Sequence, residues 1–352
     1  MYKCVKYYNI LKYKCNSKKR FFCVLLSTVL LLCTFLAGGC QRKSDPISQS
    51  GFYFNTVITV TLYDSTDTSL LDGCMELAGK YENLFSNTIA DSDISRINDA
   101  NGAAVTVDDE TITLLEKGLY YSKISDGKFD ITIGKLSSLW NFANNDSNIP
   151  ADTDIAAALA TVDYHEVVID DNQVTLTNPD ANIDLGGIAK GYIADKMKEY
   201  LNENGCTSGI INLGGNVLAI GPKEDGTPYT IGIQKPFSED GTAIASVQIT
   251  DQTVVSSGVY ERYFYADDVL YHHILDTKTG YPYENDLLGV SIICSDSVDG
   301  DGLSTTAFSL GLEDGLAFIE SLPDTEAIFI TSDYTLHKTS GIGTTIPCEE
   351  LE

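Results

Sequence analysis

The feature that most restricts how this chain can fold is an uncharged apolar run near its start. Phe21 to Ala37 are 17 consecutive residues without a charged side chain, and residues 1–39 contain seven Lys and Arg and no acidic residue. A basic segment, an apolar segment and small residues before a cleavage point together make an export signal. We therefore assign residues 1–39 as a signal peptide and expect the rest of the protein outside the cytoplasm.

The end of this run predicts how the mature protein is held. Leu36 to Cys40 resembles a bacterial lipobox, in which the Cys becomes the lipidated first residue, although Ala37 stands where that pattern prefers Leu. A run of about 20 apolar residues also suits a membrane-spanning helix, so a retained anchor is the alternative. We expect an exported protein anchored through lipid at Cys40, on the outer face of the cytoplasmic membrane or its periplasmic side.

Charge and cysteine usage exclude several functional classes. Asp and Glu number 50 against 23 Lys and Arg, which gives a formal net charge of −27 that repels nucleic acids and anionic bilayers. The cysteines beyond Cys40 are Cys74, Cys206, Cys294 and Cys348. They form no CxxC pair and have no His at metal-binding spacing, so we expect isolated buried thiols rather than a zinc or redox site.

The pattern of the remaining chain predicts one α+β domain with mixed, mostly antiparallel sheets and packed helices. Residues 40–50 are polar and read as a tether, so the domain should span residues 51–345. Strand and helix patterns alternate without a βαβ rhythm, which argues against a doubly wound sheet. We expect strands at 52–63, 167–169, 174–176, 210–213, 217–220 and 327–330, and helices at 69–85, 108–125, 188–204 and 303–321.

Two glycines before the third of these helices suggest a place where a ligand approaches the backbone. Gly186 and Gly187 precede the helix, whose first free N–H groups attract anions. Lys190 lies in the first turn, where a cation opposes the helix dipole unless an anionic ligand offsets it. A solvated lysine is the equally acceptable alternative.

Two further blocks contain residue types that carry chemistry. His272 and His273 would face opposite sides of a strand, so only one of them can point into a given site. Asp301 and Thr305 are four residues apart and share one helical face, where a carboxylate and a hydroxyl suit a hard cation such as Mg²⁺. A helix-capping Asp is the alternative. Fingerprints of dinucleotide, P-loop and serine-hydrolase sites are absent.

The order of these blocks carries more information than any one of them. SDISRIN, KFDITIG, IDLGGIAKGY, NLGGN, SSGVYER, HHILDTKTGYP and DGLSTT follow one another along the chain. This series resembles the ApbE family of flavin transferases over nearly all of residues 51–340. The chain departs from the family pattern at Phe54-Asn55-Thr56, where Met-Gly-Thr is usual, at Lys135, where Pro is usual, and at Gly302, where Ala is usual.

The resemblance implies a function and a set of site residues. FAD would be split at its pyrophosphate, FMN would be joined to a Thr of a target protein, and AMP would leave. The implied Mg²⁺ ligands are Gly187, Asp301 and Thr305, the implied FAD contacts are Phe54, Phe129, Asp130, Asp184, Lys190 and His273, and His273 would act on the acceptor hydroxyl. Asp276 is a candidate to orient His273.

Two other functions use the same residues. With water as the nucleophile, the site would be a Mg²⁺-dependent FAD pyrophosphatase that produces FMN and AMP. Without chemistry, the chain would be an FAD-binding lipoprotein. For the transferase, the resemblance implies an exported or membrane-embedded redox acceptor, such as an Rnf- or Nqr-type subunit or an FMN-binding domain protein.

Overall fold

The computed structural model describes residues 45–144, 147–238 and 240–351. Contacts divide the chain into Met1–Ser44 and Asp45–Glu352, and only the second of these units is described below. The predicted signal peptide and Cys40 lie outside the described residues, so the lipid anchor stays a prediction. Within the described ranges, no helix combines the length and the apolar character needed to cross a bilayer.

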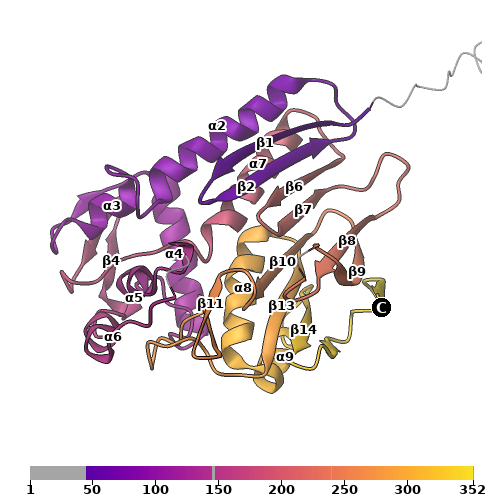
Figure 1. Cartoon of the computed structure of the whole chain (residues 1–352). Coiled ribbons are helices and arrows are strands. Elements are labelled where there is room, and N and C mark those ends of the chain that lie inside the picture. Colours follow the sequence, from indigo (N-terminus) through magenta and orange to yellow (C-terminus); the bar gives the residue numbers. More distant parts are fainter. Residues whose placement is uncertain (1–44, 145–146, 239, 352) are drawn as a thin grey trace, which may run out of the picture. The chain divides into compact units, whose positions relative to one another are not determined.

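An antiparallel sheet of eight strands forms the centre of the domain, in the order β1-β2-β6-β7-β10-β13-β14-β15 (Figure 1). The strands are β1 (Ile47–Tyr53), β2 (Thr56–Leu62), β6 (Gly209–Leu213), β7 (Asn216–Ile220), β10 (Thr253–Gly258), β13 (Leu287–Cys294), β14 (Glu326–Thr331) and β15 (Leu336–Lys338). Together with the packed helices this sheet confirms the predicted α+β class.

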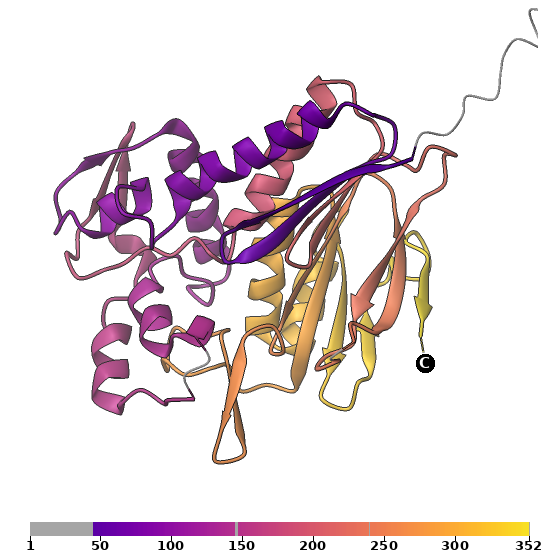
Figure 2. The same cartoon turned by 45° about the horizontal axis from the view of Figure 1, so that its top comes forward.

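The two faces of the sheet are covered by different layers (Figure 2). Helices α2 (Thr68–Phe85), α7 (Ala189–Glu203), α8 (Ser297–Leu310) and α9 (Leu312–Glu320) pack on one face, and β8 (Tyr229–Gln234), β9 (Ala243–Ile249) and β16 (Cys348–Glu350) form a small sheet over the other. Successive strand residues point to opposite faces. Ile292 and Ile293 of β13 therefore enter two separate apolar cores, and both are fully buried.

The remaining elements lie beside the helical layer. They are α3 (Asp93–Asn98), β3 (Val105–Thr106), α4 (Asp109–Ile124), α5 (Gly134–Trp140), η1 (Phe142–Asn144), α6 (Asp152–Leu159), η2 (Tyr164–Glu166), β4 (Val167–Asp170), β5 (Gln173–Leu176), β11 (Tyr263–Ala266) and β12 (Val269–His272). A third apolar cluster around Trp140 and Phe264 joins α5 to the β11–β12 hairpin. This cluster supports the strand that leads into the candidate site.

The start of the domain differs from the prediction. β1 begins at Ile47, so residues 47–50 of the predicted tether belong to the sheet, and the single strand predicted at 52–63 is a hairpin of β1 and β2. The turn is Phe54–Asn55, with φ of 51° and 55°. Such a two-residue turn needs positive φ at both positions and usually contains Gly. Because neither residue is Gly, the sequence does not reveal the reversal.

The helices at 69–85, 108–125 and 188–204 are confirmed as α2, α4 and α7. The last predicted helix is wrong in its bounds, because α8 begins at Ser297 and α9 follows it as a second helix. Gly311 separates the two helices with a φ of 80°, a conformation that favours glycine. The predicted buried thiols are confirmed for Cys74, Cys206 and Cys294, whereas Cys348 is half-buried.

Candidate functional site

Three segments that are distant in the sequence meet at the carboxylate of Asp301. Its Oδ2 accepts a hydrogen bond from the Gly191 N–H at 2.6 Å, and its Oδ1 accepts one from the Asn216 side-chain amide at 3.1 Å. Burial raises the pKa of Asp301, whereas the Lys190 ammonium and the two hydrogen bonds act in the opposite direction. The surroundings thus present hydrogen-bond donors and a cation to this buried carboxylate.

The sequence around Lys190 suggested an anionic ligand at the start of α7, but a carboxylate of the protein itself lies there. The residue before the helix, Ile188, provides no side-chain cap. The carboxylate of Asp301 instead accepts from the first turn, where N–H groups without helical partners favour an anion. The protein therefore supplies one anion of its own at the helix terminus that was expected to receive an anionic ligand.

The predicted metal ligands are oxygen donors at one place in the fold. Asp301 and Thr305 lie one turn apart on α8, and the half-buried Thr305 hydroxyl is 3.4 Å from the Ser257 hydroxyl. Gly187 is exposed just before α7, the helix whose first turn contacts Asp301. No group of three or more His, Cys, Asp and Glu side chains in the described residues could hold a metal. This donor set fits Mg²⁺, which takes few protein oxygens and fills its remaining positions with water and phosphate.

The two histidines have different surroundings. His272 is buried at the end of β12, where its Nε2 donates to the Tyr283 carbonyl at 3.2 Å and its Nδ1 accepts from the Ile274 N–H at 3.3 Å. Both ring nitrogens of His272 are therefore used within the protein. The Nδ1 atom of His273 is buried and has no hydrogen-bond partner among the described residues. Of the pair, only His273 has a ring nitrogen without a partner in the described residues, and that nitrogen is buried.

The charge state of His273 follows from its neighbours. Burial lowers its pKa to about 3, and the positive charges of Arg262 and Lys190 add to that effect together with His272. The ring is therefore neutral at physiological pH, and a pKa this low makes it a weak proton acceptor in the free protein. In the described residues no hydrogen bond or ion pair joins Asp276 to His273, and the Asp276 carboxylate accepts from the Lys278 N–H at 2.8 Å. The prediction that Asp276 orients His273 has no support in this geometry.

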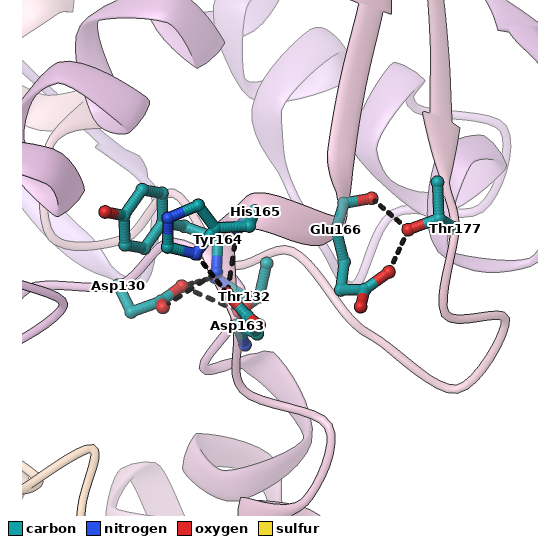
Figure 3. Close-up of polar contacts among 7 residues, drawn as sticks. All are labelled: Asp130, Thr132, Asp163, Tyr164, His165, Glu166 and Thr177. Atoms are coloured by element: carbon teal, nitrogen blue, oxygen red, sulfur yellow. Dashed lines mark hydrogen bonds and ion pairs between the residues drawn. The ribbon is translucent and has the colours of Figure 1, made fainter.

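Asp130, a predicted FAD contact, directs its carboxylate toward the protein itself. Its Oδ1 accepts from the N–H and hydroxyl of Thr132 at 2.8 Å and 2.6 Å, and its Oδ2 accepts from the Tyr164 N–H at 3.0 Å (Figure 3). The side chain is 7 % exposed, and burial raises its pKa. Asp130 thus ties the loop after α4 to η2, and its predicted contact with FAD stays a prediction.

Three other residues predicted for the site meet at the loop that precedes α7. They are Phe129, Asp184 and Gly187. A Cβ atom at Gly187 would lie 3.1 Å from the ring of Phe129, so the glycine allows the loop to approach this ring closely. Asp184 accepts from the Gly186 N–H and from the Ser137 hydroxyl, each at 2.8 Å. Phe129 and Asp184 therefore hold the exposed glycines in place.

Phe54 lies at the turn of the first hairpin, next to the turn of the β6–β7 hairpin. Its N–H donates to the Glu82 carboxylate at 2.7 Å. The Gly214 N–H donates to the Val57 carbonyl at 3.2 Å, and a Cβ atom at Gly214 would lie 2.1 Å from the Thr56 hydroxyl. The FNT and NLGGN motifs are thus brought together, and the second motif leads to Asn216 beside Asp301.

The departure at Gly302 has a structural explanation. A Cβ atom there would lie 2.4 Å from the ring of Tyr121. The Tyr121 hydroxyl donates to Asp299 at 2.6 Å, and Lys117 forms an ion pair with the same carboxylate. The ring of Tyr121 therefore takes the space that an alanine methyl group at residue 302 would need.

Arg262 is a residue of this site that the sequence analysis did not assign. Its carbonyl accepts from the His273 N–H at 3.1 Å, and its charge acts on the His273 ring. In the described part of the chain, the side chains of Lys190 and Arg262 form no ion pair or hydrogen bond, although acidic residues outnumber basic ones. The signal was available, since Arg262 ends the SSGVYER motif. Burial raises the pKa of the neighbouring Glu261, and the charges of Lys190 and Arg262 act against this, so the two cations are partly balanced within the protein. Two cations without a direct ion pair, a neutral imidazole and a set of oxygen donors suit an anionic phosphate substrate.

The comparisons with known proteins agree with this arrangement. The ApbE family model matches residues 54–329. An FAD:protein FMN transferase of Klebsiella pneumoniae is 39 % identical over 81 % of this chain and 89 % of its own length, and one of Treponema pallidum is 30 % identical over 89 % and 92 %. The crystal structure of the ApbE protein of Thermotoga maritima has a TM-score of 0.77 at 30 % identity and covers 84 % of this chain and 97 % of that one.

Proposed function

The chain belongs to the ApbE family and is an FAD:protein FMN transferase, and we propose that it works with Mg²⁺ and joins FMN to a threonine of its acceptor. The observation that carries the proposal is the grouping of Asp301 and Thr305 on α8 with Lys190, Arg262 and the unpartnered nitrogen of His273. These groups supply a cation site, two positive charges and a proton acceptor, which the transfer of a phosphoryl group requires.

The proposed reaction exchanges the phosphoanhydride bond of FAD for a phosphoester bond to the acceptor. The oxygen of a threonine hydroxyl forms a bond to the phosphorus of the FMN half of FAD, and the bond from that phosphorus to the bridging oxygen breaks. AMP leaves with the bridging oxygen, and the hydroxyl proton is taken by a base. A bound Mg²⁺ would be held by Asp301, Thr305 and the backbone near Gly187, and it would neutralise pyrophosphate charge as a Lewis acid.

His273 is the proposed base. Its ring is neutral in the free protein because burial and nearby positive charges lower its pKa to about 3. An anionic substrate beside Lys190 and Arg262 offsets their charges, and this raises the pKa of His273 toward the range in which it accepts a proton more readily. Substrate binding would thus prepare the base for the transfer.

The acceptor and the location of the protein are parts of the same proposal. The apolar run before Cys40 supports export and a lipid anchor, and the acceptor would then be an exported or membrane-embedded redox protein. An Rnf- or Nqr-type subunit or an FMN-binding domain protein has that chemistry by family resemblance. Both partners would lie on the same side of the membrane.

Replacement of Asp301 tests the proposed metal site. Asp301→Asn keeps the shape of the side chain but removes its charge, so Mg²⁺-dependent release of AMP from FAD should fall to the level without metal. Asp67→Asn is the matched control, because Asp67 is an exposed carboxylate that caps α2 in a hydrogen bond to Ser69. AMP release at the wild-type rate by folded Asp301→Asn protein would remove Asp301 from the metal site.

A further inference from the structure

Helices α7 and α8 begin beside each other, and each is capped by a carboxylate of the other. Neither Ile188 nor Asp296, the residues that precede the helices, provides a side-chain cap. Asp195 of α7 instead accepts from the N–H groups of Ser297 and Val298 at 2.8 Å each. Asp301 of α8 accepts from the first turn of α7 in return. The two helix starts therefore depend on each other.

This exchange is possible because the helices touch backbone to backbone. A Cβ atom at Gly191 would lie 2.2 Å from the Ser297 carbonyl oxygen and 2.6 Å from the Cα atom of Val298. Gly191 and Asp195 are four residues apart on α7, and Ser297 and Asp301 are four apart on α8, so each helix presents a donor and a carboxylate on one face. Only a glycine at residue 191 lets both carboxylates reach their partners.

A chain of hydrogen bonds also connects the two carboxylates through β7. The Ser297 hydroxyl donates to the Asn216 side-chain oxygen at 2.6 Å, and the Asn216 amide donates to Asp301 at 3.1 Å. Ser297, Asn216 and Asp301 are 0 %, 2 % and 4 % exposed. With the bonds to α7, the contacts close into a ring that runs from Asp195 through Ser297, Asn216, Asp301 and Gly191.

We propose that Asp195 is a positioning residue, which fixes the start of α8 and thereby the direction in which the Asp301 carboxylate offers its remaining lone pairs to a divalent cation. This inference rests on the proposed metal site. Hydrogen-bonded neighbours that orient a metal ligand change metal affinity when they are removed, although they do not contact the metal.

The burial of Asp195 also affects its ionisation. Burial raises its pKa to about 7, the nearby Asp296 charge adds to this, and the bonds from Val298 and Ser297 and the Lys198 charge oppose it. A folded-state pKa above the ordinary value means that ionisation of Asp195 costs folding stability as the pH rises toward 7.

The test compares Asp195→Asn with Asp67→Asn. Asp67 is also a helix-capping carboxylate, but it caps α2 and takes no part in the hydrogen-bonded ring. Two quantities are measured on the full chain: hydrogen exchange of the peptide containing Gly191 without metal, and Mn²⁺ and Mg²⁺ affinity by calorimetry. We expect Asp195→Asn to accelerate the exchange and to weaken cation binding about 10–100-fold, with an unchanged circular dichroism spectrum. Asp67→Asn should change neither quantity.

Wild-type exchange and wild-type affinity in Asp195→Asn would overturn the inference, and so would an equal loss of affinity in Asp67→Asn. If Asp195→Asn does not fold, Ser297→Ala tests the hydrogen-bonded ring itself, because it keeps both N–H donors to Asp195 and removes the hydroxyl that contacts Asn216 and Thr253. That variant should also weaken cation binding. A wild-type protein that binds no cation contradicts the proposed metal site, and faster exchange at Gly191 in the variant would still support the positioning role.

Discussion

Replacement of Gly191 by alanine tests the contact between α7 and α8 on which the whole site depends. Alanine is favoured over glycine inside a helix by about 1 kcal/mol, so the helix alone would gain stability. The added methyl group, however, would lie 2.2 Å from the Ser297 carbonyl oxygen. Backbone atoms cannot rotate away as a side chain can, so the helices must separate, and overpacking of this kind costs about 1–3 kcal/mol or more.

We therefore expect Gly191→Ala to lower the free energy of unfolding by up to about 2 kcal/mol after the helix gain is subtracted. The matched control is Gly79→Ala in the middle of α2, where the new methyl group would meet only the ring of Tyr53 at 3.6 Å, an ordinary contact. That variant should gain up to about 1 kcal/mol. Both substitutions replace glycine by alanine, and we expect their changes in the free energy of unfolding to have opposite signs.

Urea denaturation followed by circular dichroism measures both variants, with the slope of the transition used to check that each unfolds like the wild type. Gly191→Ala should in addition bind Mg²⁺ more weakly, because the separated helices no longer hold Asp301 against the Gly191 N–H. A gain in stability for both variants, or equal losses, would show that the close approach of α7 and α8 is not a real constraint.

Three other predictions concern the base and the anchor. His273→Gln should lower FMN transfer about 10²–10⁴-fold while FAD affinity is retained. His272→Gln should mainly reduce stability, since both nitrogens of His272 bond to the backbone. A larger loss of transfer in His272→Gln than in His273→Gln would make His272 the base. In an NMR titration, His273 should stay neutral well below pH 6 in the free protein, and its pKa should rise when FAD binds, so an unchanged pKa would contradict the proposed role of Lys190 and Arg262. Cys40→Ala should abolish lipidation and release the protein from membranes, and persistent membrane attachment of that variant would favour a retained helix.

The parts of the fold that the sequence predicts are those with local signals. α2, α4 and α7 have a helical period and clear ends, such as Gly205 with a φ of 84° just after α7. The first hairpin was missed because its turn residues, Phe54 and Asn55, adopt a conformation that their types rarely take. A turn without its usual residue gives no local signal.

Prediction of the candidate site from the sequence is limited in the same way. Motif order predicts Asp301, Thr305 and His273 as site residues, and the expected difference between His272 and His273 is seen in their surroundings. Strand alternation does not explain it, because β12 ends at His272. The reciprocal capping was not predictable, because Asp195 and its donor Ser297 are 102 residues apart. A contact between residues so distant in the sequence depends on how the helices pack, and no spacing rule along one chain reveals it.

The most direct test of the account is the fate of the FMN half of FAD. The full chain would be incubated with FAD, Mg²⁺ and a flavin-free FMN-binding domain protein, and the acceptor would then be weighed by mass spectrometry while AMP is measured by chromatography. We expect the acceptor to gain the mass of FMN less one water at a threonine, with one AMP released for each acceptor modified. Free FMN and AMP with an unmodified acceptor would instead make the protein a pyrophosphatase, and intact FAD would make it a binding protein; either result would contradict the proposed transfer to this acceptor.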